Sequence, residues 1–314
     1  MYIRGMRHPT TSSLMVLAAG LAAVLCSVGL RAGQGATESP QAAVDALLST
    51  DRAFSAASAR TDLVTGLSAM FAPDVVMPFP PGQLADTAAR ATDALRANPD
   101  NPPSKIEWTP VRGGLSADGQ HGFTFGFMTW HRADGTDVGL KYLAYWVKRV
   151  EGWRVVAYKR GRRADGTPPL ALMAPALPAS LVPASADPAV VARHRDSLDQ
   201  AERAFSRDAQ TIGLGPAFAQ YGSADAVNMG GPMDVGFVVG SEAIGKAVGG
   251  GGAGSPVSWA PDKVVVASSG DLGVTIGYIR PNAPPAGGSA APRVPFFTVW
   301  RRASANAPWK YIAE

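Results

Sequence analysis

The hydrophobic positions of the chain predict two successive blocks of structure. In the first block, apolar residues at near-helical spacing predict a helix over about residues 40–59. A shorter helix over 63–71, an apolar strand at 75–77 and a third helix near 86–97 follow. Four segments rich in β-branched and aromatic residues, separated by Asp-Gly and Glu-Gly turns, then predict strands at 108–115, 121–131, 141–150 and 153–159.

The second block repeats this order. Helices are expected at 190–208, 216–221 and 241–248, with a short strand at 226–229. Late strands are expected at 259–267, 272–280, 294–302 and 309–313. No helical segment separates the late strands of either block, which favours antiparallel hairpins over parallel crossovers. The fold class expected is therefore α+β, with helices packed on an antiparallel sheet in each block.

The two blocks are a tandem duplication. Asp51-Arg-Ala-Phe-Ser recurs 151 residues later as Glu202-Arg-Ala-Phe-Ser. The same offset aligns Trp108-x-Pro with Trp259-x-Pro, and the Gly-x-x-Gly-x-Thr-x-Gly that begins at Gly119 with the one that begins at Gly270. A domain-sized period excludes a solenoid. We expect an N-terminal segment at 1–36, domains at 37–163 and 189–314, and an Ala/Pro-rich extended linker at 164–188.

These motifs resemble the nuclear transport factor 2-like superfamily, and within it the SnoaL-like branch. The resemblance lies in D/E-R-A-F in the first helix, W-x-P opening the first long strand, S-G-D-L-G-V-T-I-G at 269–277, and Trp with a basic residue opening the last strand. It implies two tandem cone-shaped domains, in which a curved sheet wraps around the first helix and encloses an apolar pocket. Ketosteroid isomerase and scytalone dehydratase have this shape, whereas many relatives have no known activity.

The N-terminal 36 residues have the pattern of a secretory signal. Arg4 and Arg7 precede an uncharged, largely apolar run from Leu14 to Leu30. The run is near the lower limit for a spanning helix, so an uncleaved anchor is the first alternative. A lipoprotein is the second, and bulky Leu25 before Cys26 argues against it. Cys26 is the only cysteine, so a cleaved chain would hold no disulfide. The expected location is periplasmic or secreted, with membrane attachment only through an uncleaved segment.

Charge argues against a nucleic-acid partner. The formal net charge is +4, and three arginines of the first 36 residues account for most of it. Residues 37–170 hold 15 basic and 14 acidic side chains, and residues 171–314 hold 11 of each. Neither block has the basic excess that phosphate binding requires. The partners expected are a small hydrophobic ligand, and each domain for the other as an intramolecular pseudo-dimer.

Alternation along the strands groups the residues that would contact a ligand. Large apolar side chains and small Gly/Thr residues alternate along 122–128 and 273–278, so each kind occupies one face of its strand. The large phase either fills the core or lines the cone. The small phase is expected to permit sheet curvature or close approach of a helix. The candidate ligand-binding residues are Met77, Phe125, Phe127, Tyr145, Met229, Ile276 and Tyr278.

Catalytic candidates are few, and we assign a catalytic role to none of them. An isomerase or dehydratase of this shape needs an acid or base inside the cone. His121 and His131 lie at the two ends of one predicted strand, Asp74 precedes a strand, and Tyr142 could donate a hydrogen bond to an oxyanion. The second block has Leu272 and Arg280 at the histidine positions, so histidine chemistry would belong to the first domain alone.

Other chemistry finds little support in the sequence. His131 with Asp134 and Asp137 flanks an expected Asp-Gly turn, which is a weak metal motif. The four glycines at 249–252 lack the Lys-Ser/Thr of a phosphate loop. No metal and no cofactor are therefore expected.

Three functions are compatible with these features. The first is an envelope protein that binds a small hydrophobic molecule in one or both cones, or whose domains pair with each other. The second is an isomerase-, dehydratase- or cyclase-type enzyme with its active site in the first domain only. The third is an interaction module whose cones are filled by side chains.

Overall fold

The computed structural model describes residues 38–249, 252–283 and 293–314. The expected signal or anchor, with Cys26, lies outside the described residues. Among the helices that are described, none combines the length and the apolar character needed to cross a membrane.

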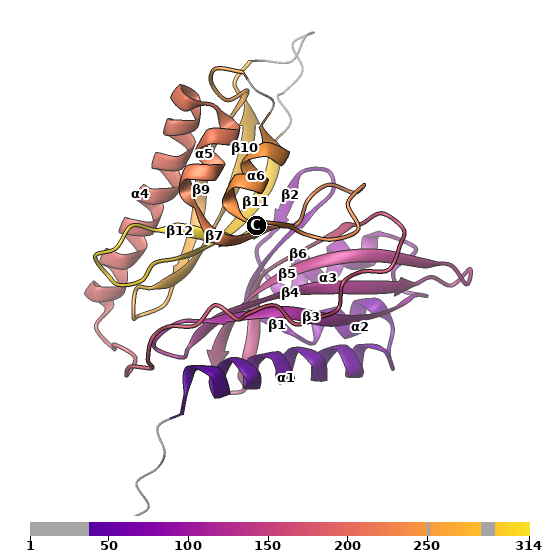
Figure 1. The fold of residues 1–314 in the computed structure, drawn as a ribbon. Coiled ribbons are helices and arrows are strands. Elements are labelled where there is room, and N and C mark those ends of the chain that lie inside the picture. Colours follow the sequence, from indigo (N-terminus) through magenta and orange to yellow (C-terminus); the bar gives the residue numbers. More distant parts are fainter. Residues whose placement is uncertain (1–37, 250–251, 284–292) are drawn as a thin grey trace, which may run out of the picture. The chain divides into compact units, whose positions relative to one another are not determined.

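The first half contains three helices and six strands (Figure 1), and all of them except the short strand Gln83–Ala85 were predicted, in this order. The helices are α1 (Pro40–Ser58), α2 (Leu63–Ser68) and α3 (Ala88–Ala97). The strands are β1 (Phe71–Phe79), β2 (Gln83–Ala85), β3 (Lys105–Leu115), β4 (His121–His131), β5 (Asp137–Arg149) and β6 (Gly152–Arg162). Local chemistry sets the helix starts: the side chains of Ser39, Asp62 and Thr87 each accept a hydrogen bond from a backbone N–H of the first turn.

The second half repeats this order. Its helices are α4 (Pro188–Ile212), α5 (Leu214–Tyr221) and α6 (Ser241–Val248). Its strands are β7 (Gly222–Asn228), β8 (Val238–Val239), β9 (Val257–Val266), β10 (Leu272–Pro281), β11 (Val294–Arg301) and β12 (Lys310–Ala313). The α+β class and the pair of similar helix-and-sheet domains are confirmed.

Each half forms one six-stranded sheet, and both sheets are mixed. Their strand orders are β2-β1-β6-β5-β4-β3 and β8-β7-β12-β11-β10-β9. The late strands are antiparallel as expected, but β1 pairs in parallel with β6, and β7 pairs in parallel with β12. The expectation of a purely antiparallel sheet is therefore corrected. The strand that follows the second helix joins the sheet beside the last strand, and this places the two in the same direction.

One face of each sheet packs against the helices of its own half (Figure 1). The small Gly and Thr residues of β4 and β10 lie on this face. A Cβ added to Gly122 would lie 2.5 Å from a methyl group of Leu47 in α1, and one added to Gly273 would lie 2.5 Å from Leu198 in α4. The absence of a side chain at these positions therefore lets the long helix approach the strand closely. We call the space between the helices and the curved sheet the cone.

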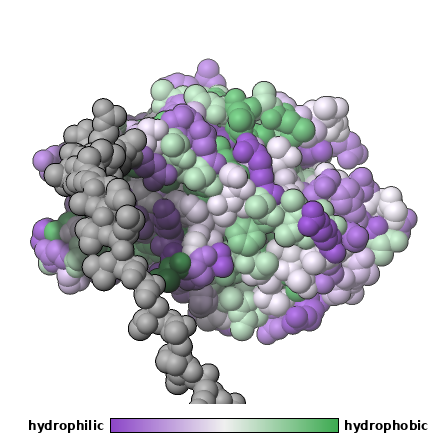
Figure 2. All heavy atoms as spheres, turned by 90° about the horizontal axis from the view of Figure 1, so that it is seen from below, coloured by the Kyte–Doolittle hydropathy of each residue, from purple (hydrophilic) through white to green (hydrophobic). Residues whose placement is uncertain are grey.

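The opposite, outer faces of the two sheets share a second apolar layer. It contains Phe123, Phe125 and Phe127 of β4 together with Leu272, Val274 and Ile276 of β10, all buried. Some large apolar side chains, such as Val150 and Met233, are exposed, and the face in Figure 2 is a mosaic of polar and apolar residues.

The segment that joins the halves covers the edge of the first sheet. Met173 and Ala176 donate backbone hydrogen bonds to Val111 and Gly113 of β3, at 2.8 and 3.0 Å. The backbone N–H of Val182 reaches the carbonyl of Ala117 at 2.8 Å. An open strand edge presents unpaired N–H and C=O groups, and this segment satisfies several of those on β3.

Candidate functional site

A buried carboxyl group on the first helix is common to both halves. Asp51 in α1 and Glu202 in α4 are fully buried. Each stands where the helical repeat places an apolar residue, since Leu47 and Leu198 precede them by one turn on the same stripe. A carboxylate in such surroundings needs hydrogen-bond donors, and the strands supply them.

In the first half, Asp51 is held by two side chains of the sheet. The indole Nε1 of Trp108 donates to Oδ1 at 2.6 Å, and the hydroxyl of Tyr142 donates to Oδ2 at 2.6 Å. Burial raises the pKa of Asp51, and the bonds from Tyr142 and Trp108 oppose that rise. Proton uptake by Asp51 therefore stabilises the folded state at low pH, and this contribution is lost as the pH rises toward the raised pKa.

In the second half, three donors serve Glu202. Trp259 donates its indole N–H to Oε1 at 2.6 Å, and Oε2 accepts from the hydroxyl of Thr275 and from Trp300 Nε1, the latter at 2.9 Å. Burial again raises the carboxyl pKa, against the effect of these bonds. Phe296 occupies the position that corresponds to Tyr142, so the phenolic donor of the first half is missing here.

A serine one helical turn onward joins the same helix to the same strand. Ser55 donates to the carbonyl of Trp108 at 2.7 Å and accepts from its backbone N–H at 2.6 Å. Ser206 accepts from the backbone N–H of Trp259 at 2.9 Å. The repeated acid-Arg-Ala-Phe-Ser motif and the repeated tryptophan are therefore two sides of one helix-to-strand connection.

The cone of the second half contains a cavity of about 230 Å³. Its walls are mostly apolar, with two carboxyl side chains. The lining residues are Glu202, Phe205, Leu214, Phe218, Val248, Val257, Trp259, Ile279, Phe296, Thr298 and Glu314. This combination of an apolar cavity and a few polar groups is typical of small-molecule sites.

Glu314 is the second carboxyl of this cavity. The side-chain amide of Asn228 donates to its Oε1 at 2.5 Å. Burial raises the pKa of Glu314 to about 7, and the positive charge of Lys159 on β6 of the first half limits the rise. Burial in turn lowers the pKa of Lys159 to about 8. One side chain of the second cone can thus exchange a proton near neutral pH.

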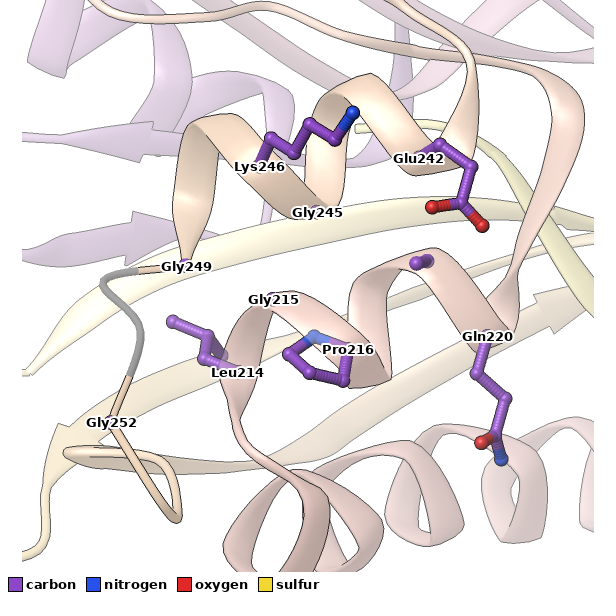
Figure 3. A pocket seen from close by; sticks show the side chains of 10 residues that line it. Leu214, Gly215, Pro216, Gln220, Glu242, Gly245, Lys246, Gly249 and Gly252 are labelled. Atoms are coloured by element: carbon purple, nitrogen blue, oxygen red, sulfur yellow. The ribbon is translucent and has the colours of Figure 1, made fainter.

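A larger hollow of about 570 Å³ lies between α5 and α6 (Figure 3). Gly215 and Gly245 let the two helices approach closely there, since a Cβ on either would lie 2.5 Å from a carbonyl of the other helix. Glu242 and Lys246 extend from α6 and are exposed. Because water screens these charges, we favour the second cone as the candidate site.

The structure places the four catalytic candidates apart. Asp74 lies on the surface, 51% exposed, and pairs with Arg149 at 3.2 Å. His131 is 39% exposed and contacts Asp137 at 2.7 Å. His121 lies on the outer face, with Nδ1 3.1 Å from the hydroxyl of Tyr145, and burial lowers its pKa to about 4. Only Tyr142 points into the first cone, where it serves Asp51.

The candidate ligand-binding residues also lie elsewhere than in the second cavity. Phe125, Phe127, Tyr145, Met229 and Ile276 belong to the layer between the sheets. Met77 is buried in the core of the first cone, and Tyr278 lies under the guanidinium group of Arg293. The expectation that the large phase lines a cone is corrected: that phase faces the other sheet.

Sequence reasoning overlooked Asp51, Glu202 and Glu314. For the first two the signal was present: an acidic residue interrupts the apolar stripe of a helix, twice, with a tryptophan 57 residues later each time. Glu314 has no such signal. Among the described residues, no group of three or more His, Cys, Asp or Glu side chains is placed to hold a metal ion.

Replacing Tyr142 tests the Asp51 network. In Tyr142→Phe, an oxygen of the buried carboxyl loses its donor, so the free energy of unfolding should fall by about 1–3 kcal/mol. The loss should be larger at pH 8 than at pH 4, since the hydroxyl stabilises the charged form. Tyr158→Phe is the matched control, because its buried hydroxyl bonds, among the described residues, to the sulfur of Met128 at 3.4 Å and to no carboxylate. Urea unfolding measures both, and equal losses would contradict this role of Tyr142.

No family model and no curated protein matches the chain. Solved structures do match it. A ketosteroid isomerase-like protein from Erwinia carotovora atroseptica is 16% identical, with 38% of this chain and 96% of that chain covered and a TM-score of 0.31. A nuclear transport factor 2-like superfamily protein from Salmonella enterica is 13% identical, with 40% of this chain and 95% of that chain covered and a TM-score of 0.31. A nuclear transport factor 2-like protein of unknown function from Burkholderia pseudomallei is 18% identical, with 37% of this chain and 88% of that chain covered and a TM-score of 0.27. The solved structures similar to this chain thus include nuclear transport factor 2-like and ketosteroid isomerase-like proteins, each covering about two fifths of it.

Proposed function

We propose that the second half binds a small, mostly apolar molecule in its cone. The observation that carries the proposal is the cavity of about 230 Å³ with a buried carboxyl in its wall. A dry cavity of about 150 Å³ is known to hold benzene, so the present one is large enough for a molecule of one or two rings. Its aromatic walls, Phe205, Phe218 and Trp259, favour a flat ligand.

The polar groups of the cavity determine which polar groups the ligand can carry. The oxygens of Glu202 already accept three hydrogen bonds, whereas one bond from a side chain reaches Glu314. An ionised Glu314 offers acceptors only. The ligand that fits best therefore carries a hydroxyl or N–H group and no negative charge, because a second anion beside two carboxyls would be repelled.

We further propose that the first half serves as a structural partner in an intramolecular pseudo-dimer. Its own buried acid, Asp51, is engaged with Trp108 and Tyr142. Its contribution to the site is Lys159, which acts on Glu314 from across the layer between the sheets. We thus assign the site to the second domain, in contrast to the enzyme alternative expected from the sequence, which had its active site in the first domain only.

A neutral aromatic alcohol tests the binding proposal. We expect 2-naphthol to bind the protein with quenching of tryptophan fluorescence, because Trp259 lines the cavity. Val257→Trp places a bulky ring in the cavity and should weaken binding at least about tenfold, since the apolar contacts of the ligand are lost. Leu172→Trp adds the same ring at a position that is 60% exposed and should leave the affinity unchanged. Equal affinities of the two variants would refute the site.

Proton transfer is a second candidate function, and the pKa of Glu314 favours it. A carboxylate that ionises near pH 7 is suited to remove a proton beside a carbonyl group. We expect the protein to accelerate deuterium uptake at the α-carbon of 2-tetralone in D₂O, with a rate that rises as the pH passes about 7. Glu314→Gln should abolish the acceleration, whereas His131→Gln should keep it. Proton NMR follows the exchange, and the absence of acceleration in the unmodified protein would leave binding alone.

We propose, finally, that the chain is exported. Support comes from Arg4, Arg7 and the run Leu14–Leu30 that follows them. We expect the protein in the envelope or medium fraction of its native host, with an intact mass that corresponds to a chain starting after residue 30. A full-length mass in the cytoplasmic fraction would contradict export.

A further inference from the structure

Arg160 is a half-buried arginine that has no partner in the part of the chain that the structure describes. It lies near the end of β6, and it makes no hydrogen bond or ion pair with any residue that the structure describes. Its Nη1 is shielded from solvent and unbonded. Arginine is seldom buried unless it is paired, and a buried donor without an acceptor destabilises the folded state. Burial lowers the pKa of Arg160, and the nearby Tyr158 opposes this effect. The guanidinium would therefore gain from an anion.

The hollow beside Arg160 has room for such an anion. It measures about 820 Å³ and lies between the turn after β1, the end of β6 and the start of β11. It contains two arginines and no acid, and its other lining is mainly apolar. The lining residues are Pro78, Phe79, Pro80, Pro81, Gly82, Gln83, Arg160, Arg293, Val294 and Pro295. Val294 is 56% exposed, which leaves apolar surface open to a ligand.

Arg293 adds a second positive charge. Its guanidinium lies over the ring of Tyr278 at 4.3 Å, and it makes no hydrogen bond or ion pair within the described ranges. Two acids, Asp86 and Asp262, line a neighbouring hollow that shares Gln83 and Arg293 with this one. Asp86 is already bonded to Arg90 at 2.8 Å. Residues 282–292, which precede Arg293, include no Asp or Glu. Among the described residues, no acid lines the hollow that contains Arg160.

We propose that this hollow is a binding site for an organic carboxylate with an apolar tail. The planar guanidinium of Arg160 matches a carboxylate with two parallel hydrogen bonds. Phe79, Val294 and the prolines provide apolar contact for the tail. The second cone selects against the same ligand, because Glu202 and Glu314 line it. The two sites thus differ in the charge that they accept, and this proposal does not depend on the function proposed for the cone.

Octanoate is the probe for this site. We expect it to bind the full chain, with Arg160→Met lowering its affinity at least about tenfold through loss of the charged fork. Arg162→Met is the matched control: it removes the same charge from the same strand, two residues on, at an exposed position outside the hollow, and it should change the affinity less than about twofold. Val294→Asp tests the site without disturbing Arg160. It introduces a negative charge at an exposed lining residue and should also weaken the binding of octanoate.

Isothermal titration calorimetry at constant ionic strength measures each affinity, and thermal unfolding verifies that each variant is folded. In support, Val257→Trp, which fills the second cone, leaves octanoate binding intact, and inorganic phosphate at the same concentration fails to compete. The proposal is overturned if Arg160→Met and Val294→Asp bind octanoate as the unmodified chain does, or if Val257→Trp abolishes binding. Competition by phosphate as strong as by octanoate would likewise exclude the apolar-tail class and leave a simple anion site.

Discussion

Each half has a sheet with two apolar faces, and only one of them can be covered by its own helices. The outer face carries the phenylalanines of β4 in one half and the aliphatic side chains of β10 in the other, all buried in a shared layer. Phe237, from the loop after β7, closes this layer by packing on Phe125 and Phe127 at ring distances of 4.8 and 4.9 Å. Apolar area of this extent is costly in water, so the duplication supplies each sheet with its cover.

An apolar layer is non-directional, and polar contacts at its border fix how the sheets meet. The turns after β3 and β9 exchange bonds: Asp271 accepts from the backbone N–H of Ala117 at 3.0 Å, and Asp118 accepts from that of Ser269 at 3.2 Å. Arg112 bonds to Asp225, and Lys141, fully buried, donates to the carbonyls of Asp234 and Gly236. These contacts bring Lys159 and Glu314 into electrostatic reach of each other.

The sequence was sufficient for the order of elements but not for which face of a strand looks inward. Alternation tells which side chains share a face of the strand. It does not tell whether the face of Phe125 or that of Gly126 is turned toward the helices, because the sequence pattern is the same in both cases. Packing determines which face is turned toward the helices, because Gly122 and Gly273 are the positions where a long helix can contact the sheet. Arg160 and Glu314 had no local signal, because their surroundings are assembled from both halves. Asp51 and Glu202 could have been predicted, because each is an acid on the apolar stripe of a helix and is therefore expected to be buried. The motif that contains them was instead used to recognise the duplication and the family resemblance.

The halves differ at this connection by one methylene group in the acid and by one hydroxyl group, since Glu202 replaces Asp51 and Phe296 replaces Tyr142. Asp51 accepts from the strand tryptophan, Trp108, and from Tyr142, whose hydroxyl reaches it across the first cone. Glu202 is longer by that group, reaches Thr275 and Trp300 directly, and needs no hydroxyl at position 296. Phe296 and Thr298 accordingly border a cavity, where the first half has Tyr142 and Ala144 packed in its core. The same helix-to-strand connection is thus kept in both copies, while the second is free to hold a ligand.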